Sequence, residues 1–315
     1  MKQRIVIVTP IYEDNDSAKR LLSELKDIYK DNIFIVAVDD GSIINPFKIN
    51  FLDEISLDGV VLKLKKNVGH QKAVAIGLQY VSNEIEWAEK IVVMDSDGED
   101  NPYSVKELID SSNSDDVDIA VGKRNARTET KQFIFFYSIY KIIFRVLTGR
   151  SITFGNFMCL KPEALKRIAI MPELWTHLAG CVLSSKLRLS SCSIDRGNRY
   201  FGQTKSNFVG FALHGFKALM VFSEEVLVRV GVCCSIIAFL AVFGGLIAIL
   251  LKSVGFATPG WFSIVMGIFM LVFLQTGTLT LMTLLLTGVV KKNDHDALTY
   301  KHFVSEIYKT NKSIA

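Results

Sequence analysis

The chain contains the segment Ile91-Val92-Val93-Met94-Asp95-Ser96-Asp97-Gly98-Glu99-Asp100-Asn101-Pro102, in which four apolar residues run directly into four carboxylates. The apolar residues predict a buried strand. Carboxylates crowded at its end repel one another. A divalent cation removes this repulsion, because Asp95 and Asp97 can offer oxygens to a hard ion such as Mg²⁺ or Mn²⁺. A solvated acidic turn closed by Asn101-Pro102 is the alternative when the motif is taken alone.

Three earlier apolar runs predict further strands, and each of them leads into polar or acidic residues. Residues 5–8 precede Thr9-Pro10-Ile11-Tyr12-Glu13, residues 33–38 precede Asp39-Asp40-Gly41-Ser42, and residues 60–64 precede Asn67-Val68-Gly69-His70. Apolar residues at helical spacing predict helices after Ser17, as N-cap, and over residues 71–80. This alternation predicts an α/β fold with a parallel, Rossmann-like sheet. Ligands of such sheets bind outside the carboxyl ends of the strands, so the polar ends should share one crevice.

The order of these motifs resembles that of a known family. Neither Gly-x-Gly-x-x-Gly nor Gly-x-x-x-x-Gly-Lys marks a phosphate-binding loop, so dinucleotide-binding and P-loop functions lose support. The four motifs, the third extended to Asn67-Val68-Gly69-His70-Gln71-Lys72-Ala73, resemble those of family 2 glycosyltransferases with the GT-A nucleotide-sugar fold. The resemblance covers about residues 4–210.

That resemblance implies a metal site and a nucleotide site at the strand ends. Asp95 and Asp97 would hold Mg²⁺ or Mn²⁺, Asp40 would contact the base, and Asp39 would support the turn around Gly41. The whole implied nucleotide site consists of Pro10, Tyr12, Glu13, Asp39, Asp40, Lys72, Asp95 and Ser96.

The apolar residues, which make up 50% of the chain, are concentrated near its C-terminal end. Residues 230–251 carry no charge, and residues 253–290 form a second uncharged stretch with a turn at Thr258-Pro259-Gly260. A membrane-spanning helix needs about 20 apolar residues, so two spans are predicted, at about 230–251 and 261–290. A buried core helix is the alternative, but it would normally show a polar face, which neither stretch has.

Basic residues predict the orientation of these spans. Arg229 precedes the first span, Lys291-Lys292 follow the second, and the loop between them carries only Lys252. Positive residues favour the cytoplasmic side. We therefore expect a multi-pass protein of the cytoplasmic (inner) membrane. Its parts would be a cytoplasmic catalytic domain over residues 1–210, a juxtamembrane amphipathic helix over 211–229, the two spans within 230–290, and a cytoplasmic tail over 291–315.

Two further stretches are predicted to lie at the membrane surface. Residues 132–147 interleave aromatic and basic side chains, and residues 208–222 are apolar but include His214 and Lys217. Aromatic rings and cations suit the headgroup layer, so both stretches are interpreted as interfacial helices. For the first stretch, a core helix whose lysines extend to the surface is an equal alternative.

Two basic segments carry the prediction of an acceptor. Gly122-Lys123-Arg124-Asn125-Ala126-Arg127 follows a predicted strand, and Arg199-Tyr200-Phe201-Gly202-Gln203-Thr204-Lys205-Ser206 precedes the membrane region. Most surface cations have no special role, but guanidinium groups suit phosphate oxygens. The second segment resembles the Arg-x-x-Gly-x-Ser-Lys element of membrane-anchored polyprenyl-phosphate glycosyltransferases of the dolichol-phosphate-mannose-synthase type, with Thr204 in place of serine.

This second resemblance implies the acceptor-binding and catalytic residues. Arg124, Arg127, Arg199 and Lys205 would bind the acceptor, and Asp97, Arg124, Arg127 and Lys205 would form the catalytic set. The chain departs from these relatives at Phe154-Gly155-Asn156-Phe157, where many of them have an acidic residue and Gly-Phe-Arg.

The expected reaction is inverting transfer of a sugar from a nucleotide-diphosphate sugar to a polyprenyl (undecaprenyl-type) phosphate, as in the synthesis of cell-envelope polysaccharide. The alternative is transfer to a sugar hydroxyl of a lipid-linked or cell-surface glycan, which needs a carboxylate base from Glu173 or Asp195. A processive synthase is disfavoured because Gln-x-x-Arg-Trp is missing from the sequence, and a non-catalytic sensor is disfavoured by the carboxylate cluster. The expected partners are the two substrates and the membrane, without nucleic acid, and a homo-oligomer is compatible with the sequence.

Overall fold

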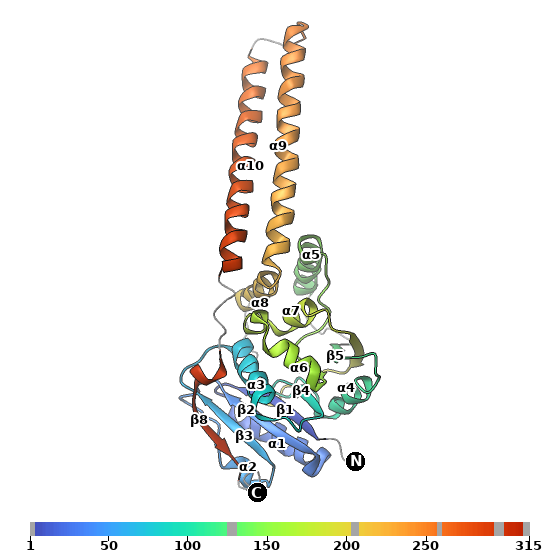
Figure 1. The fold of residues 1–315 in the computed structure, drawn as a ribbon, viewed down its shortest axis with the longest axis vertical. Coiled ribbons are helices and arrows are strands. Elements are labelled where there is room, and N and C mark those ends of the chain that lie inside the picture. Colours follow the sequence, from blue (N-terminus) through green and yellow to red (C-terminus); the bar gives the residue numbers. More distant parts are fainter. Residues whose placement is uncertain (1–3, 125–130, 203–207, 257–259, 293–298, 311–315) are drawn as a thin grey trace. The chain divides into compact units, whose positions relative to one another are not determined.

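The computed structural model describes residues 4–124, 131–202, 208–256, 260–292 and 299–310. The chain divides into two compact units, which are described separately here. The first unit comprises residues 1–141, 151–221 and 297–315, and the second comprises residues 142–150 and 222–296. Figure 1 shows the elements of both units.

The first unit is built around an eight-stranded sheet with the strand order β7-β5-β6-β4-β1-β2-β3-β8. The strands are β1 (Ile5–Ile11), β2 (Ile33–Asp39), β3 (Gly59–Leu64), β4 (Lys90–Val93), β5 (Ile119–Arg124), β6 (Met158–Leu160), β7 (Leu189–Ile194) and β8 (Val304–Lys309). Strands β1 to β4 are parallel, which confirms the α/β fold expected from the alternating pattern.

The direction of the remaining strands brings more loops to the same edge of the sheet. Strand β6 is antiparallel to both β4 and β5, so β5 runs in the same direction as β4. Strand β7 is parallel to β5, and β8 is antiparallel to β3. The carboxyl ends of β1 to β5 and β7 therefore lie at one edge, together with the amino ends of β6 and β8. We call this the carboxyl edge.

Helices of the first unit cover both faces of the sheet. Over both units, the helices in the described residues are α1 (Asn15–Tyr29), α2 (Phe51–Glu54), α3 (His70–Glu84), α4 (Val105–Ser111), α5 (Lys131–Thr148), α6 (Pro162–Ala169), α7 (Leu178–Ser184), α8 (Phe208–Met220), α9 (Ser223–Ser253) and α10 (Trp261–Lys292). Short 3₁₀ turns are η1 (Lys30–Asn32), η2 (Pro102–Ser104), η3 (Pro172–Trp175) and η5 (Tyr300–His302). The expected N-cap of the first helix was wrong. Asp14 is the cap, since its carboxylate accepts the N–H of Ser17, and Ser17 itself is buried within the helix.

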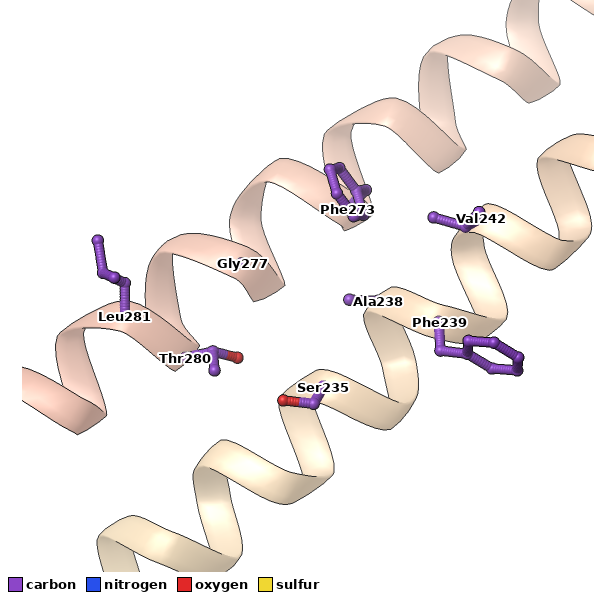
Figure 2. Close-up of a pocket in the computed structure, with 8 residues that line it drawn as sticks. All are labelled: Ser235, Ala238, Phe239, Val242, Phe273, Gly277, Thr280 and Leu281. Carbon is purple, nitrogen blue, oxygen red and sulfur yellow. The ribbon is translucent and has the colours of Figure 1, made fainter.

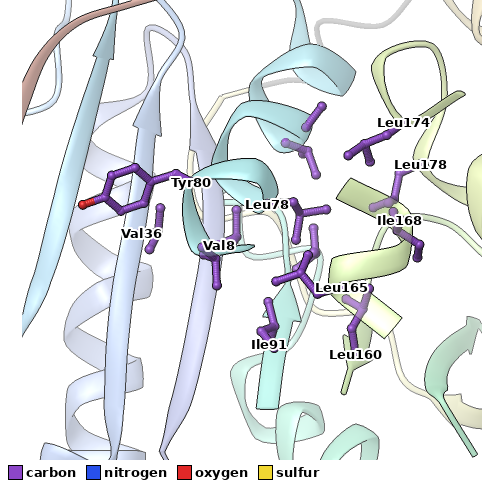
Figure 3. Packing of buried hydrophobic residues seen from close by; sticks show 14 of the residues in the cluster. Val8, Val36, Leu78, Tyr80, Ile91, Leu160, Leu165, Ile168, Leu174 and Leu178 are labelled. Atoms are coloured by element: carbon purple, nitrogen blue, oxygen red, sulfur yellow. The ribbon is translucent and has the colours of Figure 1, made fainter. Parts of the chain in front are cut away.

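Alternate residues of the central strands point to opposite faces and build two hydrophobic cores. On one face, Val8 and Ile91 pack with Leu78 of α3 and with residues of α6 and α7 (Figure 3). On the other face, Ile7 packs with α1, α2 and α4. Burial on both faces is the reason that these strands read as unbroken apolar runs rather than as alternating patterns.

The end of the chain returns to the first unit. Strand β8 pairs with β3, and Tyr300 of η5 is buried, with its ring edge-on to Tyr80 and its hydroxyl donating to Glu84 at 2.6 Å. The segment that was expected only as a cytoplasmic tail thus contributes an edge strand to the sheet. Strand β8 has mostly exposed side chains, so its own sequence carries little signal of burial.

The second unit contains two helices, α9 and α10, that are long and apolar enough to cross a membrane. Few residues of either helix are buried, which is unlike a helix in the core of a soluble protein. Small residues let the helices approach: a Cβ at Gly244 would lie only 2.5 Å from the ring of Phe269. An open apolar groove of about 440 Å³ lies between them, beside Ala238 and Gly277 (Figure 2).

Candidate active site

The carboxylate turn after β4 is folded by its own side chains. The N–H of Asp95 donates to the Asp100 carboxylate at 2.9 Å, and the N–H of Glu99 donates to Asp97 Oδ1 at 3.0 Å. Gly98 has a φ of +87°, which a glycine adopts without strain. These contacts hold Asp95 and Asp97 partly exposed at the carboxyl edge, with side chains 31% and 18% accessible.

A loop that follows β7, residues 195–200, lies against this turn. The N–H of Gly197 donates to the carbonyl of Glu99 at 2.9 Å, and the N–H of Tyr200 donates to the carbonyl of Asp97 at 2.9 Å. A Cβ at Gly197 would lie 2.1 Å from the carbonyl oxygen of Gly98, so only glycine allows this approach. The sheet topology explains the meeting, because β7 ends at the same edge as β4.

The same loop brings two arginines to the carboxylates. Arg199 contacts Asp97 Oδ2 at 3.2 Å and Glu99 Oε1 at 3.8 Å, and Arg196 pairs with the other oxygen of Glu99. Tyr200 fixes the loop from its far side, since its hydroxyl donates to Glu24 at 2.6 Å. The structure therefore joins the expected Asp97 and Arg199. Arg196 was not expected, and its only sequence signal was its place just after a strand of the sheet.

His70, at the start of α3, also reaches the carboxylate turn. Its Nε2 lies 3.3 Å from Asp95 Oδ1 and 2.9 Å from Nδ2 of Asn156. Desolvation lowers the pKa of His70, against the opposing effect of nearby Asp100, Asp97 and Asp40. The sequence placed His70 in the third motif and did not connect it with Asn156.

The donor set at this turn suits a hard divalent cation. Asp95 and Asp97 offer carboxylate oxygens, and His70 adds an imidazole nitrogen, which Mn²⁺ accepts together with oxygen ligands. Within the described residues, no three His, Cys, Asp or Glu side chains are already gathered around one point. The residues fit the ion in chemistry and in position at the edge.

On the other side of the edge, Asp39 and Asp40 hold the loops around the expected nucleotide site. Asp40 accepts the N–H groups of Val68 and Gly69 at 2.7 and 3.0 Å, and Asp39 accepts that of Ser42 at 3.0 Å. Both carboxyls are buried, and this burial raises the pKa of Asp40. The contact of Asp40 with a base stays a prediction.

Glu13 organises the loop after β2. Its carboxylate accepts the N–H groups of Ile43, Ile44 and Asn45 at distances from 2.6 to 3.1 Å. Glu13 has a φ of +48°, in the left-handed region. Of the other expected nucleotide-site residues, Pro10 is buried in β1 and Ser96 is buried after β4, while Tyr12 and Lys72 are exposed.

Three of the expected acceptor residues cannot be placed by their side chains. Arg124 ends β5, opposite Ile194 of β7, but only its backbone is described. Arg127 and Lys205 lie outside the described residues.

Of the two carboxylates considered as a base, Glu173 lies in η3, with one oxygen that is buried and makes no hydrogen bond within the described residues. Asp195 is exposed after β7.

Replacement of Asp40 with alanine is expected to weaken nucleotide binding strongly, because two loop N–H groups lose their acceptor. Hydrogen bonds to a charged group contribute roughly 1.5–3 kcal/mol each. Calorimetric titration with a panel of nucleoside diphosphates measures the affinity, and thermal unfolding shows whether the variant remains folded. Asp115→Ala, at an exposed position, is the matched control. Unchanged nucleotide affinity in folded Asp40→Ala would contradict the expectation.

Comparisons with known proteins agree with this fold. Two curated relatives are the uncharacterized glycosyltransferases YkoT of Bacillus subtilis and sll0501 of Synechocystis, which are 24% and 26% identical to this chain. Each alignment covers 86% of this chain. The alignments cover 83% of YkoT and 86% of sll0501. A crystal structure of glucosyl-3-phosphoglycerate synthase from Mycobacterium tuberculosis with Mn²⁺, UDP-glucose and phosphoglyceric acid superposes with a TM-score of 0.52. The two proteins are 10% identical in sequence. The superposition covers 72% of this chain and 79% of the synthase chain, so it supports the fold alone.

The sequence model of glycosyl transferase family 2 matches residues 6–174, which hold strands β1 to β6 except for Ile5 at the start of β1. This match includes the carboxylate turn, both nucleotide-side loops and His70. Because it spans more than half of the chain, the protein belongs to glycosyl transferase family 2.

Proposed function

We propose that this glycosyltransferase moves a sugar from a nucleotide-diphosphate sugar to a polyprenyl phosphate at the cytoplasmic face of the membrane, with inversion at the anomeric carbon. One observation carries the proposal: the two apolar helices, α9 and α10, are inserted in the chain between α8 and β8, two elements of the unit that bears the site. An enzyme anchored in this way meets its acceptor at the membrane.

The path of the chain supports the proposed topology. Strand β8 pairs with β3, so the segments before α9 and after α10 must lie on the same side of any membrane that the helices cross. An even number of spans meets this condition. Arg229 near the start of α9 and Lys291-Lys292 at the end of α10 favour the cytoplasmic side, where nucleotide sugars are made. The inner membrane is the proposed location.

The chemistry of the site favours an acceptor that is already ionised. An oxygen of the acceptor phosphate would attack the anomeric carbon opposite the leaving group. The bond from that carbon to the diphosphate oxygen would break, and the nucleoside diphosphate would leave with the electron pair. Such a nucleophile carries no proton that must be removed. Arg196 and Arg199 lie at the carboxyl edge, where they can stabilise diphosphate charge.

The metal and the remaining cations complete the proposed arrangement. Asp95 and Asp97 would hold Mg²⁺ or Mn²⁺, which neutralises charge on the departing diphosphate. Arg124, Arg127 and Lys205 are proposed, on the basis of the sequence, to contact the diphosphate or the acceptor phosphate. The strand end at Arg124 lies at the carboxyl edge, which is consistent with this role.

The proposal is tested by incubating membranes that contain the protein with a panel of radiolabelled nucleotide sugars. We expect the label to enter a lipid from which mild acid releases it, as for a sugar on a polyprenyl phosphate. Lys205→Ala should impair this transfer while sparing nucleotide binding, and Arg124→Ala should impair both. If the label enters only an acid-stable glycosidic product, the acceptor is a sugar hydroxyl and the proposal is wrong.

The topology is tested with single cysteines introduced by Thr258→Cys and Lys309→Cys. A membrane-impermeant thiol reagent added outside intact cells should label position 258 only, because that position lies in the loop between the two proposed spans. Position 309 should react only after the cells are permeabilised. Labelling of position 309 in intact cells would overturn the orientation and, with it, the cytoplasmic donor.

A further inference from the structure

A chain of amide contacts connects the start of α7 with the carboxylate turn. The backbone N–H of Leu178 lies 2.8 Å from Oε1 of Gln71, and Nε2 of Gln71 lies 3.2 Å from Oδ1 of Asn156. Nδ2 of Asn156 then lies 2.9 Å from Nε2 of His70, which in turn is 3.3 Å from Asp95 Oδ1. Gln71 is buried, so its amide has fixed partners.

The backbone group at one end sets the direction of every bond in this relay. Because Leu178 N–H can only donate, Gln71 must present its oxygen to it and its NH₂ group to Asn156. Asn156 must then accept with its oxygen and donate with its NH₂ group to His70. Turning Gln71 around would place two donors against each other at Leu178 and two acceptors against each other at Asn156, and turning Asn156 around would place two donors against each other at Gln71.

It follows that Nε2 of His70 accepts a hydrogen bond and carries no proton. The ring proton therefore sits on Nδ1. The approach of Nε2 to Asp95 then brings together two atoms that bear lone pairs, and no hydrogen bond can join them. Two such atoms at 3.3 Å can both bind one cation placed beside them.

We propose that His70 supplies its Nε2 as a nitrogen ligand to the divalent cation held by Asp95 and Asp97, and that Asn156 is a positioning residue that keeps this nitrogen unprotonated. The inference rests on the metal site of the proposed function and deepens it. A cation bound at Asp95 competes with the Asn156 N–H for the same lone pair. In the absence of the cation, the amide holds the imidazole in the tautomer that can bind it.

The test is electron spin echo spectroscopy of Mn²⁺ bound to the full-length protein in lipid nanodiscs, which detects an imidazole nitrogen directly bonded to the ion. The unsubstituted protein should show this nitrogen signal. His70→Gln should lose the signal and bind Mn²⁺ more weakly by a factor of roughly ten or more. His302→Gln, the same change at an exposed histidine of η5, should alter neither measurement.

Asn156→Asp tests the positioning role. The variant is close in size but places an acceptor against Nε2, which favours a proton on that nitrogen. The nitrogen signal should therefore fall, even though the added negative charge would by itself attract Mn²⁺. An unchanged signal in Asn156→Asp would overturn the role of Asn156.

The outcomes separate this inference from the proposed function. The ligand role of His70 is wrong if Asp97→Asn abolishes Mn²⁺ binding but the unsubstituted protein shows no nitrogen signal. It is also wrong if the nitrogen signal survives in His70→Gln. In both cases, the proposal of metal-dependent transfer stands. If Mn²⁺ does not bind at all, the ligand role falls together with the metal site. A nitrogen signal in a protein that labels no lipid would support His70 and contradict only the acceptor.

Discussion

Replacing Asp97 with asparagine is expected to reduce the rate of sugar transfer by roughly a thousandfold or more. The change keeps an oxygen that can accept the N–H of Glu99, so the turn should remain folded. It removes the negative charge that the proposed cation needs and that also pairs with Arg199. The loss should therefore fall on transfer and metal binding rather than on stability.

This expectation is checked by initial rates of transfer over a range of Mg²⁺ and Mn²⁺ concentrations. Asp115→Asn, the same substitution at an exposed acidic residue, is the control and should retain full activity. Excess chelator should abolish the activity of the unsubstituted protein. Near-normal turnover by Asp97→Asn, or full activity in chelator, would show that the carboxylate turn does not act through a metal.

The second large effect is expected for Arg199→Ala, which should lower the transfer rate by about a hundredfold to a thousandfold, as for loss of one donor to a developing negative charge. Arg199 lies within 4 Å of both Asp97 and Glu99, which places its guanidinium beside the expected diphosphate. Arg199→Lys should recover only part of the rate, because an ammonium group cannot contact both sides as a planar guanidinium does.

The control for this prediction is Arg188→Ala. Arg188 also pairs with a carboxylate, Asp118, at 2.7 Å, but more than half of its side chain is exposed. Exposed ion pairs contribute little to stability, on the order of 0–1 kcal/mol, so the control should transfer sugar normally. Full activity of Arg199→Ala would remove this arginine from the site and leave Arg196 as the cation of the loop.

The central part of the fold was predictable because its signals are local. The strands β1, β2 and β4 are buried on both faces, so they appear in the sequence as unbroken apolar runs with polar residues at their ends. The start of α1 was predictable only to within a few residues, since Asp14 and Ser17 are both good caps. Which of them caps the helix depends on the burial of Ser17 under the sheet.

The edges of the sheet were not predictable in the same way. Strand β6 has only three residues, and β8 is a largely exposed edge strand. Neither carries a periodic pattern long enough to recognise, and each is a strand because a neighbour offers it backbone hydrogen bonds. The mixed sheet is therefore a tertiary result, and it has a functional consequence: because β6 is reversed, β5 and β7 end at the same edge of the sheet as β4.

The α/β fold, the carboxylate turn at Asp95 and Asp97, and the two long apolar helices could be predicted from the amino-acid sequence. Each of these depends on residues close together in the chain, where hydrophobic periodicity and charge can be read directly. Which distant groups meet that turn depends on the tertiary fold. Arg196 and Glu99 are 97 residues apart, and Asn156 and His70 are 86 apart. Their contacts depend on strand direction and on the order of strands in the sheet, which no local pattern encodes.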